Sequence, residues 1–206
     1  PGVSDPLRAP YPAYVLCEVS TARRDPHLRA LLEDALAAAM DHGDVLEATL
    51  AESIAQREAL WRLRHSMSEA QKQEGASIKH DISVPVASMQ RFLELATHAA
   101  GQLVPGVRVV AFGHLGDGNA HFNLTQPAGA DGVAFLARWE EISRQVHELA
   151  IGLGGSFSAE HGIGALKVRE LAHWRGGVPL EVMRAVKMAL DPLGIMNPGK
   201  LFPAGS

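Results

Sequence analysis

The segment FGHLGDGNAHFN, residues 112–123, constrains the fold of this chain more than any other part of the sequence. Two runs of strand-forming residues flank Asp117-Gly118, and an Asp-Gly pair in this setting is a strong signal for a β-hairpin with a two-residue type I′ turn. That turn would place His114 directly opposite His121, with Cβ atoms about 4.5–5.5 Å apart on one face of the sheet. The hairpin therefore predicts a pair of imidazoles placed to bind a metal ion on a polar face, with apolar side chains on the opposite face.

A metal site of this kind needs a third donor, and a carboxylate is the natural one in a chain with a single cysteine. Glu160, in the segment SAEHGIG, is the best candidate because small residues and glycines around it let a loop approach a sheet closely. Its alternative role is to supply negative charge to the N-terminus of a helix that starts near Ile163. Spacing alone leaves both roles open, and each histidine taken singly is compatible with an ordinary solvated or hydrogen-bonded side chain.

Apolar periodicity predicts alternating strands and helices along the chain. Strands are expected in both arms of the hairpin and at residues 13–20, 45–50 and 76–85. Helices are expected at residues 26–40, 53–72, 88–103, 132–153, 165–174 and 180–190. This order predicts an α+β fold, a mainly antiparallel β-sheet flanked by helices, with ferredoxin-like elements and a helical C-terminal segment. The proline-rich residues 1–12 are expected to be a linker, and residues 13–206 one domain.

The composition argues against several classes of protein. With 19 Lys and Arg, 23 Asp and Glu, and 5% aromatic residues, the chain lacks the basic field and stacking surface of nucleic-acid binders. It has no apolar run of about 18–20 residues and no leader pattern, so we expect a cytoplasmic protein, or a mitochondrial one in a eukaryote. Cys17, in the apolar setting YVLCEV, is expected to be a buried strand residue. Because the chain begins at Pro1 without an initiator Met, we expect it to be part of a longer protein.

A candidate anion site comes from a predicted helix and the strand after it. Arg64 and Ser68 are four residues apart on one helix face, and Lys79 lies on the polar face of the strand. Together they could bind a carboxylate, although an ordinary solvated helix face explains the first two equally. The chain shows no G-x-G-x-x-G at the start of a βαβ unit, no P-loop spacing and no G-x-S-x-G elbow. A nucleotide cofactor held by a Rossmann half of this chain is therefore not expected.

Three segments together resemble one family: GHLGDGNAHFN, SAEHGIG and the terminal DPLGIMNPGKLFP. From Tyr14 to Pro203 the chain is similar to the C-terminal half of the FAD-linked oxidases of the vanillyl-alcohol oxidase type. That group includes D-lactate dehydrogenase, D-2-hydroxyglutarate dehydrogenase and the flavin-dependent glycolate oxidases. The resemblance implies that an N-terminal domain absent from this chain carries most FAD contacts, while this half forms a substrate domain.

The resemblance also implies roles for individual residues at the hairpin and its loop. His114, His121 and Glu160 would bind a divalent metal ion, zinc above all. His161 would be the catalytic base that takes the hydroxyl proton, and Asn119 would lie near the substrate.

Further implied positions lie outside the hairpin. The stretch WRLRHSMSEAQKQEGASIKHDISVP is most similar to the D-2-hydroxyglutarate dehydrogenase branch, in which an Arg, a Thr and a Lys hold the substrate's carboxylates. Here these positions are Arg64, Ser68 and Lys79, and the serine keeps the hydroxyl while losing a methyl group, which leaves the preferred acid open. Asn197 would lie close to the flavin, with a turn residue before Pro198 as its alternative.

These expectations lead to the substrate- and metal-binding part of an FAD-dependent D-2-hydroxyacid dehydrogenase, inactive without its FAD domain. The expected substrates are D-2-hydroxyglutarate, D-malate or D-lactate. The expected partners are the FAD-binding domain, an electron acceptor protein or quinone, and a second copy in a homodimer. Two alternatives remain: a metal-dependent hydrolase that activates water with the same His, His and Glu and needs no flavin, and a non-catalytic metal-binding module.

Overall fold

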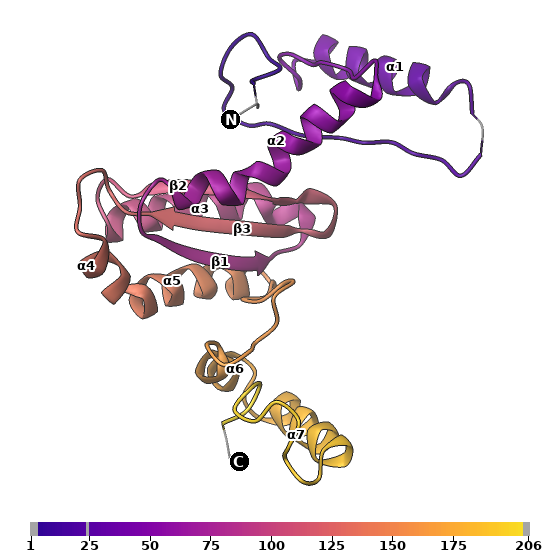
Figure 1. The fold of residues 1–206 in the computed structure, drawn as a ribbon. Coiled ribbons are helices and arrows are strands. Elements are labelled where there is room, and N and C mark those ends of the chain that lie inside the picture. The colour runs from indigo at the N-terminus through magenta and orange to yellow at the C-terminus, as the bar shows by residue number, and fades with distance from the viewer. Residues whose placement is uncertain (1–3, 24, 204–206) are drawn as a thin grey trace. The chain divides into compact units, whose positions relative to one another are not determined.

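The computed structural model describes residues 4–23 and 25–203, and the chain divides into two compact units, Pro1–Glu74 and Gly75–Ser206 (Figure 1). Residues 1–3 of the expected linker and the last three positions of the expected domain lie outside the described residues. The division into a linker and one domain stays a prediction.

Two helices form the regular part of the first unit, α1 (Leu28–Asp41) and α2 (Ile54–Lys72), as the sequence predicts. The Ser53 hydroxyl accepts the backbone N–H of Gln56 at 3.2 Å and so caps α2. The remaining segments are irregular and are joined by side-chain hydrogen bonds such as that from the Tyr11 hydroxyl to Glu47, at 2.6 Å.

The strands predicted at residues 13–20 and 45–50 are wrong, because neither segment forms a strand. A strand needs a neighbour to satisfy its backbone N–H and C=O groups, and no strand in the described part of the chain pairs with either segment. The apolar side chains of the first segment are exposed, Val15 to 81%, and Cys17 is exposed rather than buried. Strand-forming composition without a partner edge is therefore not sufficient here.

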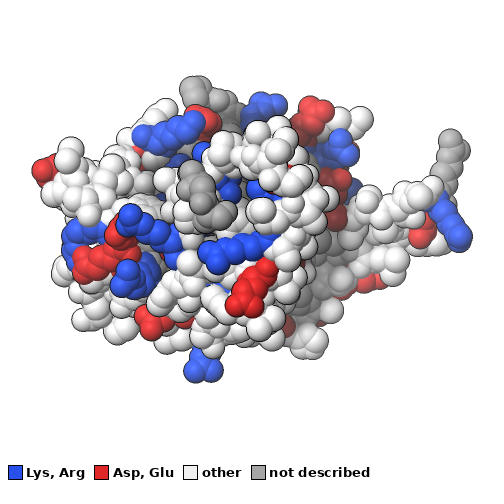
Figure 2. Space-filling model, turned by 90° about the horizontal axis from the view of Figure 1, so that it is seen from below, with Lys and Arg blue, Asp and Glu red and all other residues white. Residues whose placement is uncertain are grey.

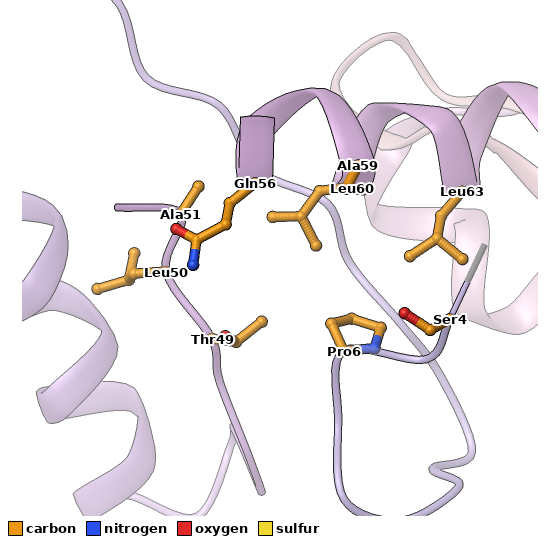
Figure 3. A pocket seen from close by; sticks show the side chains of 9 residues that line it. All are labelled: Ser4, Pro6, Thr49, Leu50, Ala51, Gln56, Ala59, Leu60 and Leu63. Atoms are coloured by element: carbon orange, nitrogen blue, oxygen red, sulfur yellow. The ribbon is translucent and has the colours of Figure 1, made fainter. Parts of the chain in front are cut away.

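A cavity of about 200 Å³ lies within the first unit, between the first half of α2 and two irregular segments (Figure 3). Its walls include Leu60 and Leu63 of α2, together with Pro6 and Thr49. No imidazole, thiol or carboxylate lines this cavity, so it offers no strong metal ligand and no general base.

The second unit is built on a three-stranded antiparallel sheet in the order β1-β3-β2. Its strands are β1 (Ser77–Ser83), β2 (Arg108–His114) and β3 (Asn119–Thr125). The helix α3 (Met89–Leu103) connects β1 to β2, and β3 lies between these two strands. This is the split β-α-β arrangement of ferredoxin-like folds, and it confirms the predicted α+β class.

The remaining elements are helices and two short 3₁₀ turns. The turns are η1 (Val86–Ser88) and η2 (Leu115–Asp117), and the helices are α4 (Gly132–Ala137), α5 (Trp139–Gly152), α6 (Val168–Trp174) and α7 (Val178–Leu190). The single helix predicted at residues 132–153 is broken at Arg138, which leaves helical geometry. The Arg138 guanidinium there donates to the carbonyl of Leu103, at 3.2 Å, at the end of α3. That tertiary contact favours the break.

One face of the sheet forms the main core. The side chains of Ile78 and Ile82 on β1 and of Phe122 on β3 are fully buried beneath α3 and α5. Phe92 of α3 meets Phe122 edge to face, with ring centroids 5.6 Å apart. A second apolar cluster joins Phe157 to α6 and α7. The opposite face of the sheet carries polar side chains and is available for binding.

Basic and acidic side chains are interspersed on the face of the molecule in Figure 2, in keeping with the small net charge of −4. Among the described residues, no helix combines the length and the apolarity that crossing a bilayer requires.

A buried histidine lies in the main core, on the strand that also supplies the polar face. His80 is 2% exposed, and its ring nitrogens contact the carbonyl of Phe122 at 2.7 Å and the hydroxyl of Ser143 at 3.1 Å. Burial, helped by the neighbouring His147, lowers the pKa of His80 from 6.5 to about 3, although the bond to the Phe122 carbonyl opposes the shift. The folded protein therefore holds this imidazole neutral.

We expect His80 to make the fold sensitive to mild acid. Below about pH 6.5 the unfolded chain binds a proton at this position that the folded chain does not, so the free energy of unfolding falls as the pH falls towards 3. Between pH 7 and pH 5 the chain should lose on the order of 2 kcal/mol more than the His80→Asn variant, by urea titration of both proteins. Parallel pH dependences of the two proteins would contradict this.

Candidate metal and catalytic site

The polar face of the sheet brings together residues from all three strands. Because side chains alternate, each row across the sheet presents one residue from each strand to this face. Two successive rows contain Asp81, His121 and Phe112, then Ser83, Asn119 and His114. The row before them contains Lys79, Asn123 and Val110. The predicted choice of face is confirmed for both histidines.

The predicted register of the hairpin is wrong by one row. His114 pairs with Asn119, and His121 pairs with Phe112, so the two histidines are diagonal neighbours rather than directly opposed. The two-residue turn is replaced by the 3₁₀ turn η2 followed by Gly118, whose φ is +70°. The cause is tertiary, since the Val84 N–H donates to the Gly118 carbonyl at 3.0 Å, and a Cβ on Gly118 would lie 2.0 Å from the Val84 carbonyl oxygen.

The loop that carries Glu160 runs along the outer edge of β1. Ser83 and Ser156 exchange backbone hydrogen bonds of 3.0 and 2.8 Å, and the Ala159 N–H donates to the Asp81 carbonyl at 3.1 Å. Gly155 makes this close approach feasible, because a Cβ there would lie 2.0 Å from the Ser83 carbonyl oxygen. The alternative role of Glu160 at a helix N-terminus is not seen, since α6 begins only at Val168.

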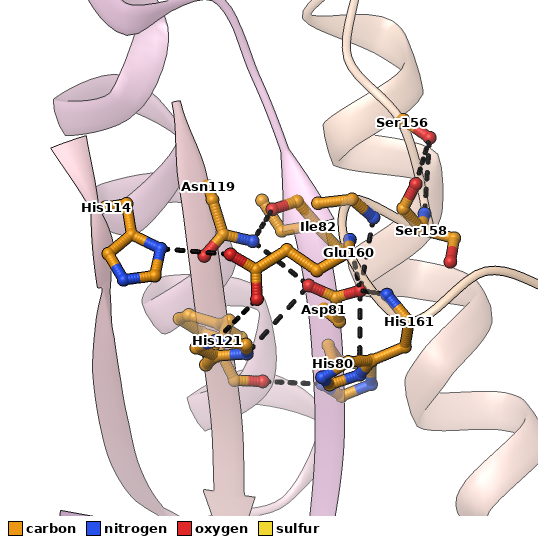
Figure 4. Close-up of polar contacts among 12 residues, drawn as sticks. His80, Asp81, Ile82, His114, Asn119, His121, Ser156, Ser158, Glu160 and His161 are labelled. Carbon is orange, nitrogen blue, oxygen red and sulfur yellow. Dashed lines mark hydrogen bonds and ion pairs between the residues drawn. The ribbon is translucent and has the colours of Figure 1, made fainter. Parts of the chain in front are cut away.

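Glu160 lies between the two histidines (Figure 4). One carboxylate oxygen is 3.0 Å from His114 Nδ1, and the other is 3.6 Å from His121 Nε2. In the described parts of the chain, donor atoms that lie within 4.8 Å of one another form two groups, His114 with Asp117 and Glu160, and Asp81 with His121 and His161. The predicted ligands thus span two adjoining groups, and Glu160 contacts the histidine of each.

His161 follows Glu160 and extends over the same face. Its ring stacks on that of His121, with centroids 5.5 Å apart and planes at 23°. Its Nδ1 lies 3.6 Å from Asp81 Oδ2, and 65% of its side chain is exposed. The predicted base therefore lies beside the predicted ligands with its ring open to a substrate.

Asp81 is the central residue that the sequence analysis missed. Its side chain is 2% exposed and accepts the backbone N–H groups of Glu160 and His161, each at 2.8 Å. Burial raises the pKa of this carboxyl group, but the N–H groups of His161 and Glu160 outweigh burial and hold the pKa below its usual value. The carboxylate is therefore ionised at neutral pH. The alternation of Lys79, Asp81 and Ser83 with apolar residues was the signal that could have identified it.

The other predicted site residues lie in three places. Asn119 is 4% exposed, and its Nδ2 donates to Asp81 Oδ1 at 3.0 Å, so it contacts the cluster from within the sheet. Arg64 and Ser68 lie one turn apart on α2 in the first unit, and Lys79 lies on β1 in the second.

Asn197 follows α7 in a turn with φ of +49°, and its carbonyl accepts the N–H of Lys200 at 3.2 Å. The carboxylate of Asp191 holds this turn by accepting the N–H groups of Ile195 and Met196, each at 3.0 Å. A turn role for Asn197 is thus present, and its position near a flavin stays a prediction.

The donor set fits a divalent cation. It combines imidazole nitrogens with carboxylate oxygens, which are ligands that zinc accepts. The buried Asn119 Oδ1 beside the cluster makes no hydrogen bond within the described structure, as expected of a polar atom that faces a site for another group.

Comparison with known proteins decides the family. The family described as "FAD linked oxidases, C-terminal domain" matches residues 2–201. This chain belongs to the FAD-linked oxidases. The family match confirms the resemblance inferred from the three sequence segments.

The FAD-linked oxidase chain is similar to proteins named D-2-hydroxyglutarate dehydrogenase. It is 37% identical to that of Stutzerimonas stutzeri over 204 residues, which is 98% of this chain and 43% of the relative. It is 37% identical to the mitochondrial protein of Bos taurus and 33% identical to that of Arabidopsis thaliana, covering 36% and 34% of them and 98% of this chain. The chain therefore spans less than half the length of these curated relatives.

We expect the docking of the loop on β1 to depend on Gly155. Its replacement by alanine places a Cβ against the Ser83 carbonyl and should lower the free energy of unfolding by about 1–3 kcal/mol, by urea titration. The matched control is Gly152→Ala, three residues earlier in α5, where a Cβ meets no atom within 4 Å and stability should hold or rise. Equal effects of the two substitutions would contradict a close approach at Gly155.

Proposed function

We propose that this chain is the substrate- and metal-binding part of an FAD-dependent D-2-hydroxyacid dehydrogenase. The observation that supports it most is the juxtaposition of Glu160, within 3.6 Å of two imidazoles, with the exposed ring of His161 on the next residue. Metal ligand and proton acceptor then come from one loop. The family and the names of the relatives supply the reaction class.

His114, His121 and Glu160 would hold the divalent metal, with zinc as the first choice. Bound to the substrate's 2-hydroxyl and an adjacent carboxylate oxygen, such an ion would act as a Lewis acid and lower the pKa of the hydroxyl. Asp117, which lies within reach of His114 and Glu160, is a further candidate ligand.

His161 would remove the hydroxyl proton. Its Nδ1 is the ring nitrogen nearer to Asp81, so Nε2 is the atom left to accept the proton from a substrate. FAD, when bound, supplies the acceptor for the hydride that leaves the substrate's α-carbon. The face of the sheet then has to bind and orient the hydroxyacid while His161 takes its proton.

Lys79 would recognise a carboxylate of the substrate. It lies on the polar face, two residues before Asp81 on β1, so its side chain points to the same side as the metal cluster. Arg64 and Ser68 on α2 would complete the carboxylate site, Asn119 would line the pocket, and Asn197 would lie near the flavin. A second carboxylate on the substrate, as in D-2-hydroxyglutarate or D-malate, favours these acids over D-lactate.

The whole protein would include an FAD-binding domain and would pass electrons to an acceptor protein or a quinone, with a homodimer as the expected assembly. A cytoplasmic location, or a mitochondrial one in a eukaryote, remains our prediction. The names of the Bos taurus and Arabidopsis thaliana relatives include the word mitochondrial.

We expect the full-length flavoprotein to oxidise D-2-hydroxyacids with an artificial electron acceptor, and to bind one equivalent of metal. His121→Ala should reduce both the bound metal, by elemental analysis, and kcat by at least about 10²-fold, because an open catalytic site has few ligands to spare. His98→Ala, on α3 and outside the cluster, is the matched control. Unchanged metal content in His114→Ala and His121→Ala would refute the site, and turnover of esters or amides without flavin would favour a hydrolase.

Lys79→Ala should weaken the binding of dicarboxylates selectively. The loss of one charge-assisted bond to a carboxylate corresponds to about 1.5–3 kcal/mol, so KM for D-2-hydroxyglutarate should rise at least tenfold. KM for D-lactate should change less if Lys79 binds the distal carboxylate. Lys72→Ala, at the end of α2, serves as the charge-matched control. Equal changes for both acids would place Lys79 elsewhere.

A further inference from the structure

We propose that Asp81 is the positioning residue of this site, and that its one buried carboxylate holds Glu160, His161 and His121 in register with one another. The inference rests on the proposed function for its catalytic consequence, and on geometry alone for its structural one. Neither the family description nor the names of the relatives assign a role to this residue.

One oxygen of Asp81 organises the backbone of the loop. Oδ2 accepts the N–H groups of Ala159 at 3.2 Å and of Glu160 and His161 at 2.8 Å each. Three successive N–H groups converge on a single charged atom, and bonds to an ionised acceptor are stronger than neutral ones. The backbone at Glu160 and His161 is therefore fixed with respect to β1 from beneath.

The other oxygen faces the sheet. Oδ1 accepts Asn119 Nδ2 at 3.0 Å and lies 3.9 Å from His121 Nδ1, while His121 Nε2 faces Glu160. A carboxylate on the far nitrogen of a ligating histidine fixes its tautomer and its ring orientation. Asp81 thus acts on one predicted ligand through its side chain and on the other through its backbone.

The same bonds argue that Asp81 is not itself a ligand. Three N–H donors surround Oδ2 and the Asn119 amide occupies Oδ1, so the lone pairs are already used. Packing alone does not fix the loop's side chains, since those of Glu160 and His161 are 41% and 65% exposed. Positioning must come from the backbone bonds, which meet at Asp81.

Two substitutions separate the charge of Asp81 from its shape. In Asp81→Asn, the remaining oxygen can still accept the loop N–H groups, while the new NH₂ can donate to Asn119 if that amide turns its oxygen over. This variant keeps much of the geometry and removes the charge beside His121. Asp81→Ala removes both, and Asp131→Asn, at the start of α4, is a matched control because asparagine caps a helix as aspartate does.

The test uses the full-length flavoprotein and three measurements: amide hydrogen exchange by mass spectrometry, zinc affinity by competition with a chelator, and steady-state kinetics. In Asp81→Ala the amides of residues 159–161 should exchange at least tenfold faster. Zinc affinity should fall about 10–100-fold in both Asp81 variants. kcat should fall about 10²-fold in both while KM is unchanged, because the reacting groups are displaced and the carboxylate site is not.

Exchange rates and zinc affinity in both variants equal to those of the control would overturn the proposal. A complete loss of bound metal at saturating zinc in Asp81→Asn would overturn it too, because Asp81 would then be a ligand. If Asp81→Ala does not fold, Asp81→Asn decides through zinc affinity and kcat. If the parent protein oxidises no D-2-hydroxyacid, the proposed function fails, whereas faster exchange with weaker zinc binding still supports the positioning role.

Discussion

A buried negative charge is the constraint on which the site depends. An ionised carboxylate that loses its water must recover that stabilisation from hydrogen bonds, and Asp81 recovers it from backbone N–H groups of the segment Ala159 to His161. The loop therefore lies against the edge of β1 because the charge requires its donors. Gly155 permits the approach and the Ser83–Ser156 bridge extends it. The position of Glu160 between two imidazoles follows from this docking.

The period of two along β1 divides one strand between two environments. His80 points into the core and is held neutral, while its neighbour Asp81 points to the polar face and is held ionised. The difference arises from partners, since both side chains are buried: His80 meets a carbonyl and a hydroxyl, and Asp81 meets several N–H groups. A single strand thus contributes both to the stability of the sheet and to the geometry of the site.

Local patterns predicted the helices, the α+β class and the face of the sheet that carries His114 and His121. They failed where a tertiary contact decides. The register of the hairpin depends on the bond from Val84 to Gly118, and strands at residues 13–20 and 45–50 would have needed partner edges that local sequence does not reveal. The importance of Asp81 was within reach of alternation, but its bonds to a loop far along the chain were not. Sequence spacing also carries no information on how the first unit, with Arg64 and Ser68, meets the second.

The bond between Asp81 and His161 joins residues 80 positions apart, whereas the hairpin closes over a few residues. Closing so long a segment costs conformational entropy that only the finished sheet can offset. The hairpin can form early from local contacts, but the loop can dock only after β1 has joined β3. The chemistry of the site is therefore assembled last on folding, and partly folded chains would carry the two hairpin histidines without the loop that unites them.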